Sequence, residues 1–174
     1  MTKRWLFAGL SVGLLSLALW LGWETSHPDQ HTIYLIRHSE KASGVDPTLS
    51  PCGEARADLW AHWLAGHNLH QIYSTDTRRT RQTAERIARR LGHALAVERY
   101  DGAALAPLAE RLRLRTENAL VVGHSNTTPA LVGLLVGRAL PALSESQFDK
   151  LWQVTVRSGQ SPELAEITLD FDCP

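Results

Sequence analysis

The chain has 174 residues with 18 basic and 18 acidic side chains, so its formal net charge is zero at pH 7. This length suits one domain with a sizeable core rather than two domains. Because the charge is balanced, no global field favours nucleic acid as a partner, and a function that depends on charge must come from a local cluster.

The N-terminal segment is predicted to be a membrane anchor. Lys3 and Arg4 precede residues 5–23, which hold no charged side chain and are long enough to cross ~30 Å of hydrocarbon as a helix. Trp20 and Trp23 suit the membrane interface, and the preceding positive charges place the N-terminus in the cytoplasm. The rest of the chain is then expected in the periplasm or another extracytoplasmic space. The alternative is a cleaved signal peptide, which would also export the domain.

The sequence divides into three parts. Residues 1–23 form the expected single transmembrane helix of the inner (cytoplasmic) membrane, or the signal. Residues 24–31 are polar, contain Pro28 and are expected to be a linker. Residues 32–174 are expected to form one folded domain.

Within this domain, short apolar runs alternate with longer amphipathic segments. The expected strands cover residues 32–36, 71–74, 95–100, 119–123, 150–157 and 163–171. The expected helices cover residues 50–67, 77–92, 103–115 and 128–137. This alternation predicts an α/β fold, a three-layer α/β/α sandwich with a mostly parallel central sheet. The last two strands follow each other without a helix and are expected to be antiparallel.

Charged side chains come directly after four of the expected strands. They are Arg37 and His38 after the first, Arg78 and Arg79 after the second, Asp101 after the third and His124 after the fourth. Ligands of α/β sheets bind at the carboxyl ends of the strands. These side chains are therefore expected to converge on one edge of the sheet.

Two histidines and two or three arginines are typical of a phosphate site. Guanidinium groups match phosphate oxygens in a bidentate geometry and stay charged at physiological pH. Arginine is a poor metal ligand, and the two cysteines lack metal-binding spacing. A histidine within such a cluster can attack phosphorus. We therefore expect a small phosphorylated substrate, with no metal and no organic cofactor.

Three motifs, in this order, resemble the histidine phosphatase superfamily, which is also called the phosphoglycerate-mutase-like family. They are RHSE at residues 37–40, STDTRRTRQTA at residues 74–84 and VVGHS at residues 121–125. The resemblance implies that His38 is the nucleophile and becomes phosphohistidine. It also implies that Arg37 and Arg79 hold the phosphoryl oxygens, and that His124 completes the pocket and stabilises the transition state.

Some positions depart from the pattern of the family. Ser39 stands where a glycine usually follows the nucleophilic histidine, and Asp76 replaces a usual proline. Only 36 residues separate Ala84 from Val121, which leaves no room for the long insert that covers the pocket in mutases and acid phosphatases. The layout therefore resembles the small, lid-less phosphatases of the family, and the expected activity is hydrolysis of phosphomonoesters.

Several assignments keep an alternative. No motif identifies the general acid: Asp101 is the candidate, and an ordinary Asp-Gly turn residue is the alternative. Arg78 is the alternative to Arg79, because six arginines crowd residues 78–90. A protein that binds phosphorylated ligands without turning them over is the alternative to an enzyme.

The predicted compartment leads to two further expectations. An exported enzyme is expected to act on phosphoesters of the cell envelope, such as phosphorylated sugars of the outer-membrane lipopolysaccharide. In an oxidising compartment, Cys52 and Cys173 are expected to form a disulfide, and two free thiols are the alternative.

Overall fold

The structure, a computed structural model, describes residues 30–92 and 95–173. Strands and helices alternate along this part of the chain. In order they are β1 (Gln30–Arg37), α1 (Pro51–Leu64), β2 (Leu69–Ser74), α2 (Arg78–Leu91), β3 (Val97–Arg99), α3 (Leu105–Arg113), β4 (Asn118–Gly123), α4 (Thr127–Val136), β5 (Lys150–Arg157) and β6 (Glu163–Thr168). Every expected element is present, with boundaries that shift by a few residues.

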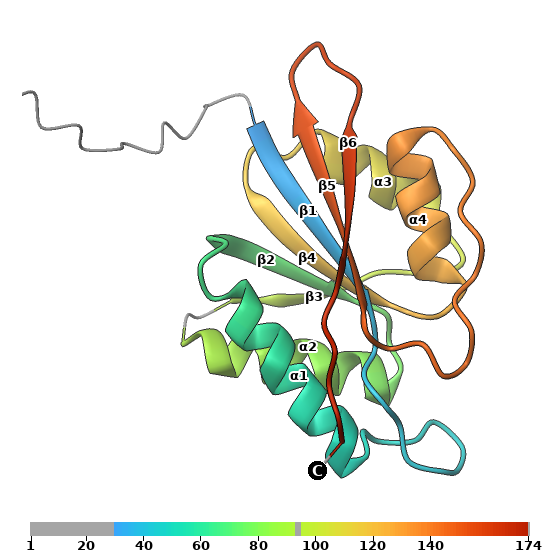
Figure 1. The fold of residues 1–174 in the computed structure, drawn as a ribbon. Coiled ribbons are helices and arrows are strands. Elements are labelled where there is room, and N and C mark those ends of the chain that lie inside the picture. The colour runs from blue at the N-terminus through green and yellow to red at the C-terminus, as the bar shows by residue number, and fades with distance from the viewer. Residues whose placement is uncertain (1–29, 93–94, 174) are drawn as a thin grey trace, which may run out of the picture.

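The strands form one sheet in the order β3-β2-β4-β1-β5-β6 (Figure 1). The first four of these are parallel to one another, whereas β5 is antiparallel to β1 and β6 is antiparallel to β5. The sheet is therefore mixed: four of its six strands are parallel, as expected, and the last two are antiparallel, as also expected. The antiparallel pairing of β5 with β6 follows from the short turn between them, where Gly159 has a φ of 71°, because a connection of this length joins only antiparallel strands.

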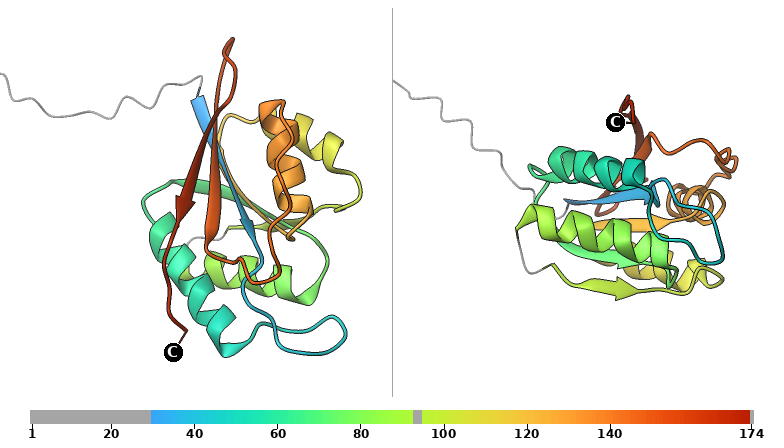
Figure 2. Two further views of the ribbon diagram at one scale, coloured as in Figure 1. Left: turned by 45° about the vertical axis from the view of Figure 1, so that its right-hand side comes forward. Right: turned by 90° about the horizontal axis from the view of Figure 1, so that it is seen from below.

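The helices cover both faces of the sheet, as the expected three-layer arrangement requires. α1 and α2 pack on one face, and α3 and α4 pack on the other (Figures 1 and 2). β1 is buried on both sides, so Ile33 and Leu35 enter the core under α3 and α4 while Tyr34 and Ile36 enter the core under α1 and α2. This alternation is the two-residue period of a strand, applied to a strand that has no solvent face.

The register of the parallel strands brings their carboxyl ends to one edge of the sheet. Arg37 of β1 is paired with Gly123 of β4, and Ser74 of β2 is paired with Val122 of the same strand. The residues that follow these strands therefore leave the sheet side by side. The backbone N–H of His38 also donates to the Gly123 carbonyl at 2.9 Å, which extends the ladder by one residue into the region of the expected site.

The C-terminal tail is bound to the start of α1. Cys52 and Cys173 form the expected disulfide, with their Cα atoms 5.1 Å apart. Ser50 is the N-cap residue of α1, and its hydroxyl accepts a hydrogen bond from the backbone N–H of Gly53. A side chain at position 53 would collide with the Glu40 carbonyl oxygen, because a Cβ there would lie 2.0 Å from it. The loop after His38 and the N-terminus of α1 are thus packed backbone to backbone.

The N-terminal boundary of the folded domain differs from the expected one. β1 begins at Gln30, so the last two residues of the expected 24–31 linker belong to the sheet. His31 is buried there, and its Nε2 lies 2.8 Å from the Leu112 carbonyl oxygen. The expected membrane span at residues 5–23 lies outside the described residues. Within the described part of the chain, no helix has the length and apolar character needed to cross a membrane.

Candidate active site

His38 lies in the centre of the converging side chains. It is 2% exposed and immediately follows β1. Its Nδ1 is 2.7 Å from the Ser39 carbonyl oxygen, which can only accept a hydrogen bond. Nδ1 therefore carries the proton, and Nε2 is unprotonated and keeps its lone pair as an acceptor. This is the tautomer that a nucleophilic histidine needs.

Arg79 lies between the two histidines. It is in the first turn of α2, and its Nε donates to His38 Nε2 at 3.2 Å. Its Nη2 lies 3.4 Å from His124 Nδ1. Arg78, the alternative, is exposed, and its backbone N–H donates to the Asp46 carboxylate at 2.9 Å. The structure thus brings Arg79 into the cluster and leaves the Arg78 side chain outside it.

His124 follows β4 and is held by a chain of hydroxyl groups. Its Nε2 lies 2.8 Å from the Thr75 hydroxyl, which in turn donates to the Thr80 hydroxyl at 2.9 Å. The Thr80 hydroxyl donates to the Thr75 carbonyl oxygen at 3.0 Å. With these directions fixed, Nε2 of His124 is the donor to Thr75. Nδ1 then faces Arg79 as an acceptor.

Arg37 is the last residue of β1, and it binds the segment that precedes β5. It is 2% exposed, and its Nη1 donates to the carbonyl oxygens of Ser144 at 2.7 Å and Gln147 at 3.1 Å. Its guanidinium also lies 4.1 Å from the centroid of the Phe148 ring. Its Nε is buried and has no partner among the described residues. The Nε edge is therefore the part of Arg37 that can still serve a phosphoryl oxygen, while Nη1 holds the segment around residue 145 in place.

Thr75, Glu145 and Phe148 contact the cluster, although the sequence analysis did not single them out. The Glu145 carboxylate accepts hydrogen bonds from Arg37 Nη2 at 3.2 Å and from the Ser125 hydroxyl at 3.4 Å. Phe148 lies with its ring centroid 6.0 Å from that of His38. Thr75 could have been found, because it directly follows a strand. The other two lie in an irregular segment that has no periodic signal.

Asp101 follows β3 as expected, but its carboxylate has a local role. Its Oδ1 accepts a hydrogen bond from the backbone N–H of Ala103 at 2.8 Å, which closes a turn at this exposed position. Among the described residues, no hydrogen bond joins Asp101 to either histidine. The turn nevertheless lies at the rim of the site, because a Cβ built at Gly102 would be 3.4 Å from the Thr75 methyl group.

The electrostatic surroundings keep both histidines neutral. Burial is the main cause that lowers the pKa of His38 to about 3; the charges of Arg37 and Arg79 act in the same direction, and the hydrogen bond to Ser39 opposes them. Burial, followed by the charges of Arg79 and Arg37, lowers the pKa of His124 to about 4. The cluster is therefore a buried positive site with an uncharged nucleophile, which is suited to attract a phosphate dianion.

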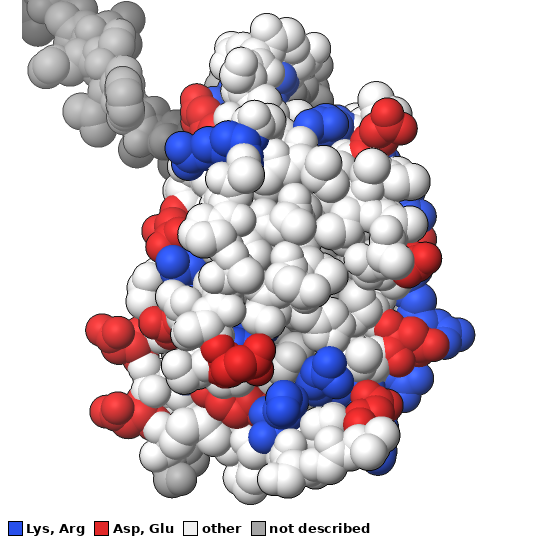
Figure 3. Space-filling model, turned by 90° about the vertical axis from the view of Figure 1, so that its right-hand side faces the viewer, with Lys and Arg blue, Asp and Glu red and all other residues white. Residues whose placement is uncertain are grey.

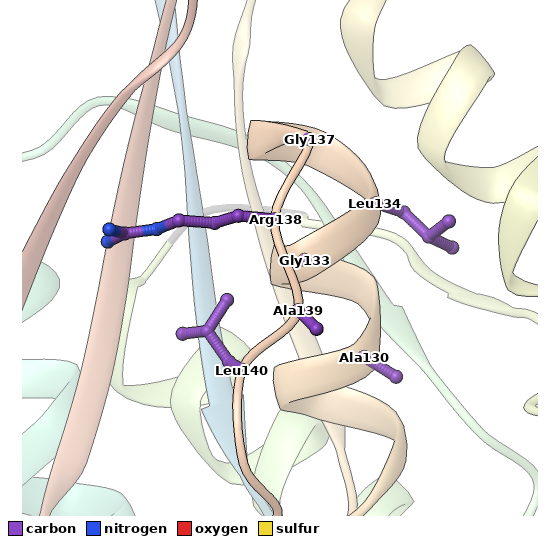
Figure 4. Close-up of a pocket in the computed structure, with 7 residues that line it drawn as sticks. All are labelled: Ala130, Gly133, Leu134, Gly137, Arg138, Ala139 and Leu140. Carbon is purple, nitrogen blue, oxygen red and sulfur yellow. The ribbon is translucent and has the colours of Figure 1, made fainter.

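Elsewhere on the described residues, one face and one hollow differ from the cluster. Lys and Arg are interspersed with Asp and Glu on the face shown in Figure 3. A hollow of about 580 Å³ lies along α4 and the segment after it (Figure 4). It is lined by small and apolar residues, and the Arg138 guanidinium extends away from the helix. Arg138 is the one charged residue among those that line this hollow, which therefore does not have the arginine and histidine cluster of the candidate active site.

The two depressed histidine pKa values predict that stability falls in mild acid. Between about pH 4 and pH 6.5 the unfolded chain binds protons at both positions and the folded chain does not, so the free energy of unfolding rises with pH. His124→Gln should flatten this dependence, by on the order of 2 kcal/mol across the window. Urea unfolding at several pH values measures it, with the exposed His62→Gln as control. Equal slopes in wild type and His124→Gln would contradict the assignment.

Comparison of the sequence with known protein families gives a match that covers part of the chain. Residues 33–104 match the model of the histidine phosphatase superfamily (branch 1). This segment contains His38 and Arg79, whereas His124 lies beyond it. No curated protein sequence matches the chain.

Solved structures share the fold over most of the chain. A protein histidine phosphatase SixA complexed with tungstate has a TM-score of 0.66 and 19% identity, over 79% of this chain and 96% of that one. A putative phosphohistidine phosphatase SixA from Nakamurella multipartitia has a TM-score of 0.61 and 22% identity, over 82% and 98% of the two chains. A mycobacterial glucosyl-3-phosphoglycerate phosphatase has a TM-score of 0.62 and 15% identity, over 81% and 100%. The expected resemblance to the histidine phosphatase superfamily is thus confirmed for residues 33–104, and the solved structures share the fold over most of the chain.

Proposed function

We propose that this protein is a phosphatase that transfers the phosphoryl group of a small phosphorylated substrate first to His38 and then to water. The observation that carries the proposal is the fixed tautomer of His38. Its Nδ1 is committed to the Ser39 carbonyl, so the Nε2 lone pair is directed toward Arg79 and His124. A protein that only binds phosphate needs cations but has no need of a buried neutral histidine in this orientation, which favours the enzyme over the non-catalytic alternative.

The reaction follows from the donors in the cluster. A phosphate dianion takes over the hydrogen bonds of Arg79 and the unpartnered Nε of Arg37, which releases the Nε2 lone pair of His38. Nε2 attacks phosphorus in line, the bond to the leaving oxygen breaks, and that oxygen takes up a proton. Water then attacks phosphorus, the N–P bond breaks with its electron pair returning to Nε2, and inorganic phosphate leaves. Such chemistry rests on positioning and electrostatic stabilisation.

His124 changes its role when the substrate binds. In the empty site its pKa is lowered to about 4, and Nδ1 accepts from Arg79. An incoming dianion raises the pKa of His124 by direct attraction, so Nδ1 takes up a proton and donates to a phosphoryl oxygen. Arg37, Arg79 and His124 together then stabilise the equatorial charge of the transition state.

A carboxylic acid completes the cycle by protonating the leaving oxygen. Asp101 remains the candidate from the sequence, and Glu145 is a second one because its carboxylate touches Arg37 and Ser125. A general acid matters most when the leaving oxygen is strongly basic. The activities of Asp101→Asn and Glu145→Gln on ethyl phosphate and on nitrophenyl phosphate identify the general acid. Replacement of the general acid should lower only the hydrolysis of ethyl phosphate. A residue whose replacement lowers both activities equally is not the general acid.

Phosphohistidine is a second candidate substrate. The Asp101 carboxylate accepts a hydrogen bond within a turn, which favours a substrate that needs no general acid. Phosphohistidine is such a substrate, because its leaving group is an imidazole with a pKa near 6.5, which leaves without the proton that an alkoxide needs. The solved SixA structures, described as phosphohistidine phosphatases, support this candidate only by their shared fold. A phosphohistidine peptide therefore belongs in every assay beside the phosphomonoesters.

His38→Ala is expected to lower kcat by at least ~1000-fold, because the nucleophile is lost, while the circular dichroism spectrum stays that of the folded protein. Brief mixing of wild type with ³²P-labelled substrate should yield protein-bound label that is acid-labile and stable to alkali, and that maps to His38. His62→Ala on the exposed side of α1 is the control. Label on a serine, or activity that survives in His38→Ala, would falsify the mechanism.

Arg79→Ala and Arg78→Ala form a matched pair within one helix turn. Arg79→Ala should lose ~2 kcal/mol of transition-state stabilisation, about 30-fold in kcat/KM, because Arg79 alone of the two contacts both histidines. Arg78→Ala should remain within about twofold of wild type. Steady-state kinetics with nitrophenyl phosphate decide the matter, and the reverse order would exclude Arg79 as the phosphate ligand.

The proposal includes an extracytoplasmic location with residues 5–23 as the inner-membrane anchor, and an envelope phosphoester such as a lipopolysaccharide sugar phosphate as substrate. The charge pattern of residues 3–23 supports the anchor, and the Cys52–Cys173 disulfide suits an oxidising compartment. A reporter fused after residue 174 should be active only outside the cytoplasm, and the protein should remain in membranes after an alkaline wash. Cytoplasmic reporter activity would overturn the location, and a shortened soluble chain would show a cleaved signal.

A further inference from the structure

A polar groove of about 410 Å³ opens beside the candidate active site, and we call it the strap groove. Its walls are Arg56 of α1, residues 144 and 146–149 of the segment before β5, and residues 170–172 of the C-terminal tail. Its volume falls within the ~300–1,000 Å³ that is typical of small-ligand sites. None of the proposed catalytic residues lines it.

The groove and the catalytic cluster share a wall. Phe148 lines the groove, and its ring lies 6.0 Å from the His38 ring and 4.1 Å from the Arg37 guanidinium. On the other side, Arg56 donates to the Glu40 carboxylate at 2.6 Å, two residues after His38. Phe148 and Glu40 thus link the residues of the groove to the surroundings of His38.

Two residues that line the groove each carry a buried polar atom with no hydrogen-bond partner among the described residues. One is Nη1 of Arg56, a side chain that is more than nine-tenths buried, and the other is Oδ1 of Asp149. Arg56 Nη1 requires an acceptor and Asp149 Oδ1 requires a donor. Unpaired buried groups of this kind are costly, so both favour a ligand that satisfies them.

Only some ligand chemistries meet both requirements. An ammonium group donates to Asp149 but offers nothing to Arg56, and a carboxylate accepts from Arg56 but repels Asp149. A hydroxyl group donates and accepts, so neighbouring hydroxyls serve both atoms. The groove adds further polar groups on Ser146 and Gln147 and the apolar ring of Phe171. Carboxylate, amide, hydroxyl and aromatic side chains together suit a polyhydroxylated ring.

We propose that the strap groove binds the leaving group of the substrate and that this group is a sugar or another polyol. This inference rests on the proposed phosphatase function for its orientation, but the groove is a binding site in its own right. Asp149 and Arg56 orient the hydroxyls, and residues 170–172 form the outer wall. The Cys52–Cys173 disulfide holds that wall against α1, where the Phe171 ring lies 4.9 Å from the Arg56 guanidinium.

Binding to the full chain in detergent, with His38→Asn to prevent turnover, tests the groove without catalysis. Calorimetry should show that glucose 6-phosphate binds at least tenfold more tightly than inorganic phosphate. Asp149→Asn should remove most of this difference and leave phosphate affinity within about twofold. Asp170→Asn, an exposed wall residue, gives the same test if Asp149→Asn does not fold. Asp76→Asn, which pairs with Arg99 away from the groove, is the matched control.

Each outcome is decisive for one of the two proposals. If glucose 6-phosphate binds no better than phosphate, or if the groove variants weaken both ligands equally, the strap groove is not the leaving-group site. If Asp149→Asn lowers the affinity for phosphoethanolamine more than the affinity for glucose 6-phosphate, the polyol assignment is wrong. If the binding pattern is as expected but His38-containing protein hydrolyses no substrate, the groove stands and the phosphatase function fails. The double variant with Cys52→Ser and Cys173→Ser should bind glucose 6-phosphate more weakly than wild type does, while its affinity for inorganic phosphate should stay unchanged.

Discussion

The parallel pairing of β1 with β4 is the constraint on which the site depends. It aligns Arg37 with Gly123, so the next residues on each strand are His38 and His124, and their rings lie with centroids 5.5 Å apart. Both β1 and β4 are covered on both faces and paired on both edges, so their ends are held more firmly than a loop could be. A shift of one residue in this register would turn every core side chain of β1 to the opposite face. The geometry of the two histidines is thus fixed by the same contacts that build the core.

The site concentrates positive charge where water is largely excluded, and the structure stabilises that charge with neutral and anionic groups that do not compete for the ligand. The two Nη groups of Arg37 donate to backbone carbonyls and to one exposed carboxylate, that of Glu145, and the guanidinium lies over the Phe148 ring. Glu145 is on the surface, so it can leave the guanidinium when a phosphate arrives. Burial, helped by the charges of the arginines, keeps the histidines neutral, and the neutral form is the one that the proposed attack on phosphorus requires. In the proposed mechanism, one buried positive site therefore serves both substrate attraction and nucleophile activation.

The sequence permitted prediction of those parts that have a local or periodic cause. Ser50 before Pro51 and Gly92 after Leu91 marked helix ends, and the strand-end rule brought Arg37, His38 and His124 together. The contacts of Arg37 with residues 144–148 could not be predicted, because they depend on an irregular segment more than 100 positions away. In the sequence, Asp101 before Gly102 is equally consistent with a turn residue and with a catalytic acid. Only the structure shows that the Asp101 carboxylate accepts the hydrogen bond of the Ala103 N–H and so closes a turn. β1 extends into the expected linker because β5 pairs with it as far as Gln30, which polarity alone did not indicate.

The disulfide has a further consequence for the order in which the chain can assemble. The covalent loop that it closes contains β2 to β6, and β1 is the described strand that lies outside it. In the reduced chain, pairing of Ile36 with Leu151 closes the whole stretch between them. In the oxidised chain, the same two residues are connected through the bond by residues 36–52 and 151–173, a much shorter path. Because the entropy lost on loop closure grows with path length, oxidation lowers the cost of inserting the central strand. The bond thus changes the effective contact order of the fold as well as the position of the tail.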